Sequence, residues 1–353
     1  MNCRWEDCVY LKDEEIVDYY KGKNEKCLYF IGKGFDPRMC EGISLVLRAN
    51  PNLTVYLIEY DEGKNSSSHK YSDCVDANYR RLKEIAKDIK DIKIETPLSR
   101  LPIFLKRNMP KDFFIGYEKV IIDISSMPQT ISFNLIKHIV SNCGDEFKLD
   151  ILTCENSAFD DIIIPTGLAE TANYLNGFSM FSMEIESEDD SVTVWLPLLG
   201  KNCKDELEKI YSFISPNEIC PVLPFPSTNP KKSDEILYAV GELLFSSFLV
   251  EKKNILYVAE NNIVQVYKKL CSTVEYYNEA LKIIGKTKFI FTVGSSKLIG
   301  IGALLASMEI YDNNISTSFA LVENDGYIFN GANYDSAKNN IYCLCLYDNI
   351  YKW

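Results

Sequence analysis

The chain has 353 residues, of which 46% are hydrophobic and 25% charged, and its formal net charge is −12. This composition is typical of a globular protein long enough to form two domains. The acidic balance argues against binding to polymeric nucleic acid, because binding to its phosphates needs a basic surface. No apolar stretch reaches the roughly 20 residues of a membrane-spanning helix. The acidic N-terminal segment also differs from a signal peptide, so we expect a cytoplasmic protein with no membrane association.

The 12 cysteines are scattered singly along the chain, and several, including Cys154, Cys343 and Cys345, lie within apolar runs. Cysteine in such runs behaves as a small hydrophobic residue, so we expect reduced core thiols and no disulfide framework. The sequence contains no Cys-x-x-Cys motif and only two histidines. The spacing therefore predicts no metal site.

The first half of the chain alternates predicted strands with predicted helices after a helical lead-in over residues 1–26. Strands are expected at 27–31, 53–60, 93–95, 120–124 and 149–154, and helices at 37–50, 75–91 and 129–142. Such alternation is typical of parallel sheets with helices packed on their faces.

The second half repeats this alternation. Strands are expected at 192–199, 219–223, 255–259, 289–293 and 316–322, with helices at 204–214, 233–250, 263–284 and 298–310. The predicted domains are a lead-in (1–26), a first Rossmann-like lobe (27–160), a connector (161–190), a second lobe (191–325) and a tail (326–353). The connector ends in an acidic run at 184–190, and the tail has one strand-like run at 341–347.

Three landmarks occur twice at nearly constant spacing. Gly200 follows Gly32 by 168 residues, Gly294 follows Ser125 by 169, and a glutamate at 323 follows Glu155 by 168. Each landmark comes directly after an apolar run. The pattern predicts an α/β protein made of two Rossmann-like lobes with mainly parallel sheets, related by internal duplication and packed around a shared cleft.

The most prominent candidate ligand loop follows the first of these strands and comprises Gly32, Lys33, Gly34, Asp36 and Arg38. Ligands of open α/β sheets bind beyond the carboxyl ends of the strands, where glycines permit close approach of the backbone. Lysine and arginine can add charge-assisted contacts to an anion. The same residues also suit a plain helix start, since aspartate is a good N-cap and proline is preferred in the first turn.

Two further clusters occupy equivalent positions after later strands. They comprise Ser125, Ser126 and Gln129 in the first half, and Gly294, Ser295, Ser296 and Lys297 in the second. Hydroxyl, amide and ammonium groups at a strand end can bind a phosphate or a base edge. Both serine pairs could instead cap the helices that follow them.

Acidic residues end several of the predicted strands, as Glu59, Glu155 and Glu323 do. A carboxylate in such a place can bind ribose hydroxyls, although charged residues at strand ends are also common on plain surfaces. The sequence has no Gly-x-Ser-x-Gly motif and few histidines, so no nucleophilic triad is expected. No catalytic residue and no cofactor is assigned.

The run Gly294-Ser295-Ser296-Lys297, after a buried strand and before a helix, resembles the second ligand motif of CARF domains, which sense cyclic oligonucleotides. The tandem pattern over residues 27–323 is similar to the SAVED domains of bacterial antiphage systems. The resemblance implies that the cleft binds, with cleavage as a further option, a small nucleotide-type ligand, within a defence system that supplies a protein partner.

Two alternatives stay open. The loop Gly32-x-Gly34-x-Asp36-x-Arg38, with Glu59 ending the next strand, is similar to the ligand loop of S-adenosylmethionine-dependent methyltransferases. The other alternative is a non-catalytic scaffold, in which aromatic residues of the tail form a partner surface. Those aromatic residues are Tyr342, Tyr347, Tyr351 and Trp353.

Overall fold

The computed structural model describes residues 3–60, 66–143, 148–160, 162–178, 191–328 and 334–349. The chain forms two compact units. Unit 1 comprises Met1–Glu6 and Gly167–Asn324, and unit 2 comprises Asp7–Thr166 and Asp325–Trp353. The C-terminal segment, expected to form a separate tail, is therefore part of unit 2. The acidic run at 184–190 lies outside the described residues, as do Tyr351 and Trp353.

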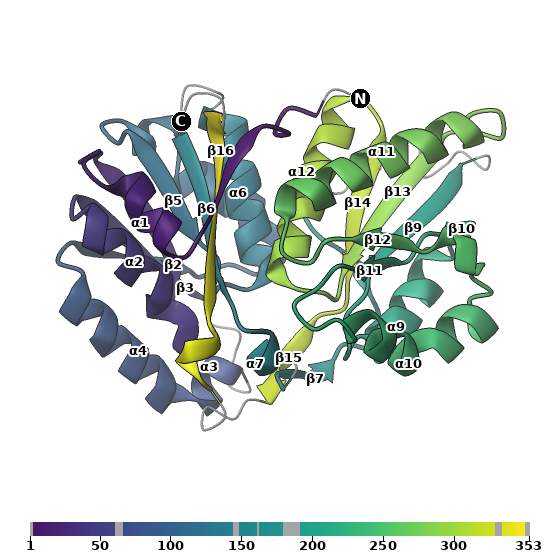
Figure 1. Ribbon diagram of the computed structural model, residues 1–353, viewed down its shortest axis with the longest axis horizontal. Helices are drawn as coiled ribbons and strands as arrows, with labels where there is room; N and C mark the ends of the chain where they lie inside the picture. The colour runs from purple at the N-terminus through teal and green to yellow at the C-terminus, as the bar shows by residue number, and fades with distance from the viewer. Residues whose placement is uncertain are drawn as a thin grey trace. The chain divides into compact units, whose positions relative to one another are not determined.

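Unit 2 contains a seven-stranded sheet in the order β1-β16-β6-β5-β2-β3-β4 (Figure 1). The strands are β1 (Cys8–Lys12), β2 (Cys27–Gly32), β3 (Leu53–Tyr60), β4 (Ile89–Ile94), β5 (Lys119–Asp123), β6 (Lys148–Glu155) and β16 (Asn340–Asn349). Strands β2 to β6 are parallel, whereas β16 runs antiparallel to both β6 and β1. The strand order reverses between β2 and β5, which makes their carboxyl ends the expected ligand crevice.

Helices cover the sheet of unit 2. They are α1 (Glu14–Tyr20), α2 (Glu41–Ala49), α3 (Ser67–Lys70), α4 (Ser72–Ile85), α5 (Leu101–Asn108), α6 (Gln129–Cys143) and α7 (Ser157–Asp160). Apolar residues of α1, α2 and α4, among them Ile16, Ile43 and Leu82, form one core with alternate residues of the strands. The other face carries Phe30 and Tyr56, whose ring centroids lie 5.8 Å apart. Burial on both faces explains why these strands read as continuous apolar runs.

Unit 1 contains a second sheet in the order β12-β11-β9-β13-β14-β8, with β10 also paired to β9. Its strands are β8 (Asn173–Tyr174), β9 (Val192–Leu198), β10 (Glu218–Ile219), β11 (Val222–Pro224), β12 (Leu256–Val258), β13 (Thr287–Val293) and β14 (Ser316–Leu321). Its helices are α9 (Lys204–Ile214), α10 (Lys232–Glu242), α11 (Ile263–Leu281) and α12 (Lys297–Asp312). Here the order reverses between β9 and β13. A third sheet pairs β7 (Ile164–Leu168) with β15 (Asn324–Ile328), where the chain passes between the units.

The predicted fold class is confirmed, because both large sheets are mainly parallel and alternate with helices. The order β4-β3-β2-β5-β6 in unit 2 matches β12-β11-β9-β13-β14 in unit 1 when the short strand β10 is left aside. This order of parallel strands is widespread among nucleotide-binding α/β folds. Internal duplication stays a prediction. The first 26 residues were expected to be a helical lead-in, but they contain the strand β1 as well as α1. Among the described helices, none is long and apolar enough to span a membrane.

Candidate functional site

The loops after β2 and β5 contact each other at the point in unit 2 where the strand order reverses. The Ser126 hydroxyl donates a hydrogen bond to the carbonyl oxygen of Gly32 over 2.7 Å. A Cβ atom on Gly32 or Gly34 would lie 3.2 Å from the Ser126 carbonyl oxygen, so glycine permits this approach. The structure thus brings together three of the predicted site residues, Gly32, Gly34 and Ser126. The Ser126 hydroxyl links the loop after β5 to the loop after β2.

Lys33 and Glu59 meet beside this loop and form an ion pair. The Nζ atom of Lys33 lies 2.8 Å from Oε1 of Glu59, and the two side chains are 22% and 36% exposed. Glu59 lies near the carboxyl end of β3, beside the predicted ligand loop, as the sequence suggested. The pair is accessible to a ligand, but each charge already has a counter-charge.

Arg38 is buried and belongs to an ion-pair cluster rather than to an open anion site. Its Nε and Nη2 atoms contact both carboxylate oxygens of Asp36, at 3.0 and 2.7 Å, and Nη1 contacts Asp160 of α7 at 2.7 Å. Burial lowers the pKa of the Arg38 guanidinium, but the charges of Asp36 and Asp160 outweigh burial and hold that pKa well above its usual value. Only 3% of the side chain is exposed, so phosphate binding by Arg38 is not what this arrangement provides.

Asp36 also starts the helical turn that follows, which is the structural role that the sequence left open. Its side chain accepts a hydrogen bond from the backbone N–H of Arg38, and Pro37 occupies the first position of the 3-10 helix at Pro37–Cys40. The amide of Asn78 on α4 donates to the carbonyl oxygens of Gly34 and Asp36. The loop is therefore fixed at both ends by groups of unit 2.

Ser125 was expected to face the crevice, but it is fully buried and structural. Its N–H and hydroxyl both donate to Oδ1 of Asp123, and its hydroxyl oxygen accepts from the N–H of Cys154 on β6. The Tyr29 hydroxyl donates to the other oxygen of Asp123 over 2.7 Å. Sequence reasoning missed Asp123, an acid inside an apolar strand, and that unusual placement was the available signal.

Gln129 and Glu155 complete the predicted set in unit 2. Gln129 begins α6 and is half-buried. Glu155 ends β6, where its backbone pairs with Asn340 of β16, and its Oε1 atom is buried. The strand β16 thus runs alongside Glu155, a neighbour that sequence order could not reveal.

The equivalent reversal point in unit 1 is closed by backbone contact between two glycines. A Cβ atom on Gly200 would lie 1.7 Å from the carbonyl oxygen of Gly294, and the N–H of Gly294 donates to Leu198 at the end of β9. Ser296 caps α12 by accepting from the N–H of Ile299, and Lys297 is the first helical residue. The Ser295 hydroxyl oxygen is buried and has no hydrogen-bond partner among the described residues.

Gly302 lies inside α12, where a glycine lowers helix stability unless close packing requires it. A Cβ on Gly302 would lie 2.5 Å from Cγ1 of Val266 on α11, so this glycine permits contact between two helices. The neighbour that requires glycine here is therefore the helix α11.

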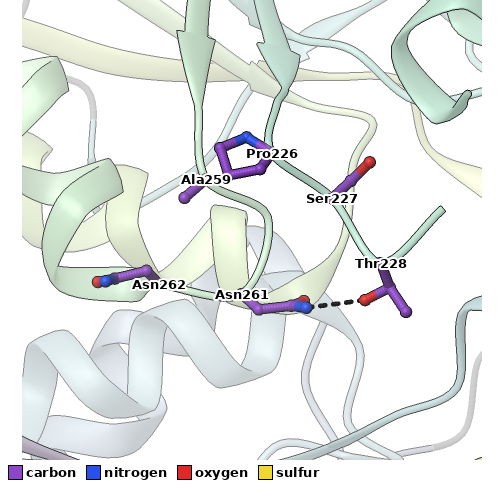
Figure 2. A pocket seen from close by; sticks show the side chains of 6 residues that line it. All are labelled: Pro226, Ser227, Thr228, Ala259, Asn261 and Asn262. Atoms are coloured by element: carbon purple, nitrogen blue, oxygen red, sulfur yellow. Dashed lines mark hydrogen bonds between the residues drawn. The ribbon is translucent and has the colours of Figure 1, made fainter. Parts of the chain in front are cut away.

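A pocket of about 250 Å³ opens near the carboxyl ends of β11 and β12 in unit 1 (Figure 2). It is lined by Pro226, Ser227, Thr228, Ala259, Asn261 and Asn262. The Asn261 amide donates to the Thr228 hydroxyl over 2.8 Å, and Asn262 caps α11. Next to Asn261 in the chain, the buried carboxylate of Glu260 accepts from the N–H of Thr228 and pairs with Lys232. The pocket therefore offers neutral hydrogen-bonding groups.

Of the tail aromatics expected to form a partner surface, Tyr342 is buried and stacks on Tyr10, with ring centroids 5.9 Å apart. Tyr347 is half-buried at the end of β16. Neither presents the exposed ring that a partner surface would need.

Comparison with known proteins identifies no family. No family model matches the sequence, and no curated protein matches it. Solved structures similar to parts of the chain include a putative methyltransferase from Thermobifida fusca YX (13% identity, 40% of this chain and 49% of that chain, TM-score 0.24). Another is the SAH-bound Podospora anserina methyltransferase PaMTH1 (10% identity, 39% and 50%, TM-score 0.24). A putative uncharacterized protein from Mycobacterium Paratuberculosis is similar over 81% of this chain and 75% of its own, at 10% identity and a TM-score of 0.23. The similar region spans about half the length of the two methyltransferases.

Proposed function

We propose that unit 2 binds a nucleoside-bearing ligand without phosphate groups, of the S-adenosylmethionine type, at the carboxyl ends of β2 and β3. The observation that carries this proposal is the half-exposed carboxylate of Glu59, 2.8 Å from Lys33 and beside the Gly32–Gly34 loop. A carboxylate in this position of a doubly wound sheet can accept hydrogen bonds from both ribose hydroxyls.

The charges around this loop support a ligand without phosphates. Asp36, Glu59 and Asp160 supply three carboxylates, while Lys33 and Arg38 supply two cations, and both cations are held in ion pairs. A polyphosphate would add negative charge next to this excess of carboxylates over cations. Phosphate sites are favourable when cationic groups face the phosphate. A sulfonium is a cation and meets no such repulsion. The chemistry that such a ligand supplies is transfer of its methyl group to a nucleophile.

A second candidate function concerns unit 1 and follows the nucleotide-sensing resemblance. The buried Ser295 hydroxyl oxygen, which has no hydrogen-bond partner among the described residues, lies next to the N-terminus of the 16-residue helix α12. Helix N-termini favour anions, and Lys297 starts this helix. We propose a phosphate-bearing ligand there as the alternative, with the defence context and a protein partner as further expectations.

The two candidates are separated by thermal shift and isothermal titration calorimetry with S-adenosylmethionine, S-adenosylhomocysteine, ATP and a cyclic oligoadenylate. A ligand at 100 times its Kd stabilises the unit that binds it by about 2.7 kcal/mol. Glu59→Gln should weaken S-adenosylmethionine binding by on the order of 1.5–3 kcal/mol, the range for hydrogen bonds to charged groups. Glu84→Gln on the exposed side of α4 is the matched control and should bind normally.

The possible outcomes distinguish the two proposals. S-adenosylmethionine binding that survives Glu59→Gln would remove the carboxylate from the site. Binding of the cyclic oligoadenylate alone, lost in Lys297→Ala, would favour the unit 1 site. No shift with any of the four compounds would contradict both proposals.

A further inference from the structure

A pair of cysteines on the last strand places two thiols side by side in the core of unit 2. Cys343 and Cys345 alternate along β16, and residues two apart on a strand point to the same face of the sheet. Both are fully buried, and their Sγ atoms lie 3.9 Å apart. From the sequence we expected these residues only to be separate buried thiols. The Cys-x-Cys spacing places two thiols on one face only if the segment is a strand.

Asp150 adds a carboxylate to this pair. In the antiparallel ladder between β6 and β16, Asp150 is directly opposite Cys345, and directly opposed residues share a face. A carboxylate oxygen of Asp150 and the two Sγ atoms all lie within 4.8 Å of one another, and Asp150 is 1% exposed. Three groups that can ligate a metal ion therefore converge on one small volume.

The spacing of the two sulfur atoms suits a tetrahedral ion. Zinc–sulfur bonds of roughly 2.3 Å at a tetrahedral angle separate two thiolates by roughly 3.8 Å. The observed separation is 3.9 Å. The Tyr20 hydroxyl donates to Oδ2 of Asp150, so a fourth candidate ligand atom, an oxygen, lies beside the cluster.

The charges around the cluster also suit a divalent cation. Two thiolates and a carboxylate carry one negative charge more than a divalent ion neutralises, and a buried net charge is costly. The ammonium of Lys119, itself fully buried, lies 2.8 Å from Oδ2 of Asp150 and places a positive charge beside the cluster. Glu25 and Asp348 also contact Lys119, at 3.6 and 3.8 Å. Lys148 pairs with Glu25 at 2.7 Å.

We propose that Asp150, Cys343 and Cys345 bind a thiophilic divalent cation, with Zn²⁺ as the expected occupant. The site lies toward the amino end of β6, away from the Gly32–Gly34 loop at the carboxyl ends of the strands. A metal here fastens β16 to β6 and so acts on folding, because the binding free energy of a buried structural metal is also folding free energy. The inference is independent of the proposed ligand of unit 2.

The test measures metal content and cobalt spectra of the full-length protein. Protein from zinc-supplemented cells should hold about one zinc per chain by inductively coupled plasma mass spectrometry. After the zinc is replaced by Co²⁺, a thiolate-to-cobalt charge-transfer band should appear in the near ultraviolet. Cys343→Ser and Cys345→Ser should each lose most of the zinc and of the band. Cys154→Ser is the matched control, since Cys154 is a buried thiol on β6 outside the cluster, and it should keep both.

Two results would overturn the proposal. One is wild-type protein with well under about a tenth of a zinc per chain and no cobalt band. The other is a Cys154→Ser protein that loses as much metal as the cluster variants. If the serine variants fail to fold, the wild-type protein still decides the question through its zinc content, its cobalt band and a fall in Tm after treatment with a strong chelator.

Discussion

A Cβ atom placed on Gly200 would lie 1.7 Å from the carbonyl oxygen of Gly294, so the loops after β9 and β13 are in backbone contact. Gly200→Ala should therefore force the two loops apart and lower the free energy of unfolding of unit 1 by about 3 kcal/mol or more, as overpacking of rigid backbone does. Chemical denaturation followed by circular dichroism measures this. Gly241→Ala on α10 is the control, because its nearest contact is an ordinary 3.6 Å and alanine favours the helix. Equal stability of the two variants would contradict the contact.

Replacing Arg38 should destabilise unit 2 more than replacing an exposed arginine. Arg38→Ala leaves the carboxylates of Asp36 and Asp160 without their buried partner, a change that costs about 3–5 kcal/mol. Arg38→Lys should rescue only part of the loss, since lysine cannot form the two-pronged contact with Asp36. The control is Arg48→Ala, which removes an exposed pair with Glu14 and should not measurably change the urea midpoint. A tolerated Arg38→Ala would show that the cluster is not coupled to folding.

Ser125 should matter for stability, whatever ligand the protein binds. Ser125→Ala removes one donor from the buried Asp123 and the acceptor of the Cys154 N–H, and an unsatisfied buried polar group costs about 1–3 kcal/mol. Ser44→Ala is the control, because that hydroxyl only donates to a carbonyl at the start of its own helix. Urea denaturation of both variants gives the comparison. A Ser125→Ala protein of unchanged stability that loses ligand binding would instead return Ser125 to the binding site.

The stability of unit 1 should depend on the protonation of Glu206. Burial, and then the charge of Asp205, raise the pKa of the Glu206 carboxyl from 4.5 to about 7. The folded protein therefore keeps this proton to higher pH than the unfolded chain does, and stability falls as pH rises from about 4.5 to 7. Glu206→Gln removes the cost of ionisation, so it should stabilise the protein at pH 8 by roughly 1–3 kcal/mol, the lower end reflecting partial solvent exposure.

The same substitution should change little at pH 4.5, where the wild-type carboxyl is protonated in the folded state. Unfolding midpoints of the wild type and Glu206→Gln across this pH range provide the measurement. Glu208→Gln, at an exposed glutamate one position beyond Leu207 on α9, is the control for the loss of one carboxylate from this helix. Parallel pH profiles of the wild type and Glu206→Gln would contradict the raised pKa.

Much of the fold could be predicted from the sequence, because its central strands are buried on both faces. Runs such as 53–60 and 204–214 coincide with β3 and α9 residue for residue. The failures lie where long-range pairing decides the structure. The strand β1 is short and preceded by polar residues, and only its antiparallel ladder with β16 makes it a strand.

The candidate site was predictable in position but not in the roles of its residues. The Gly32–Gly34 loop and Glu59 lie where strand order places them. The partners of Arg38 could not be foreseen, because Asp160 is 122 residues away and its approach depends on the packing of α7. Ser125 is buried because its N–H and hydroxyl both donate to the buried carboxylate of Asp123. The partners of that carboxylate depend on side-chain packing, which the sequence does not show.

The position of β16 has a consequence for synthesis on the ribosome. This strand lies between β1 and β6, although among the strands it is the last to leave the ribosome. Until it emerges, β6 has an unpaired edge and β1 has no neighbour in the sheet, and exposed strand edges promote aggregation of nascent chains. Every strand of the unit 1 sheet, by contrast, is translated before residue 325. The sheet of unit 1 can therefore form before β16, which completes the sheet of unit 2, has been translated.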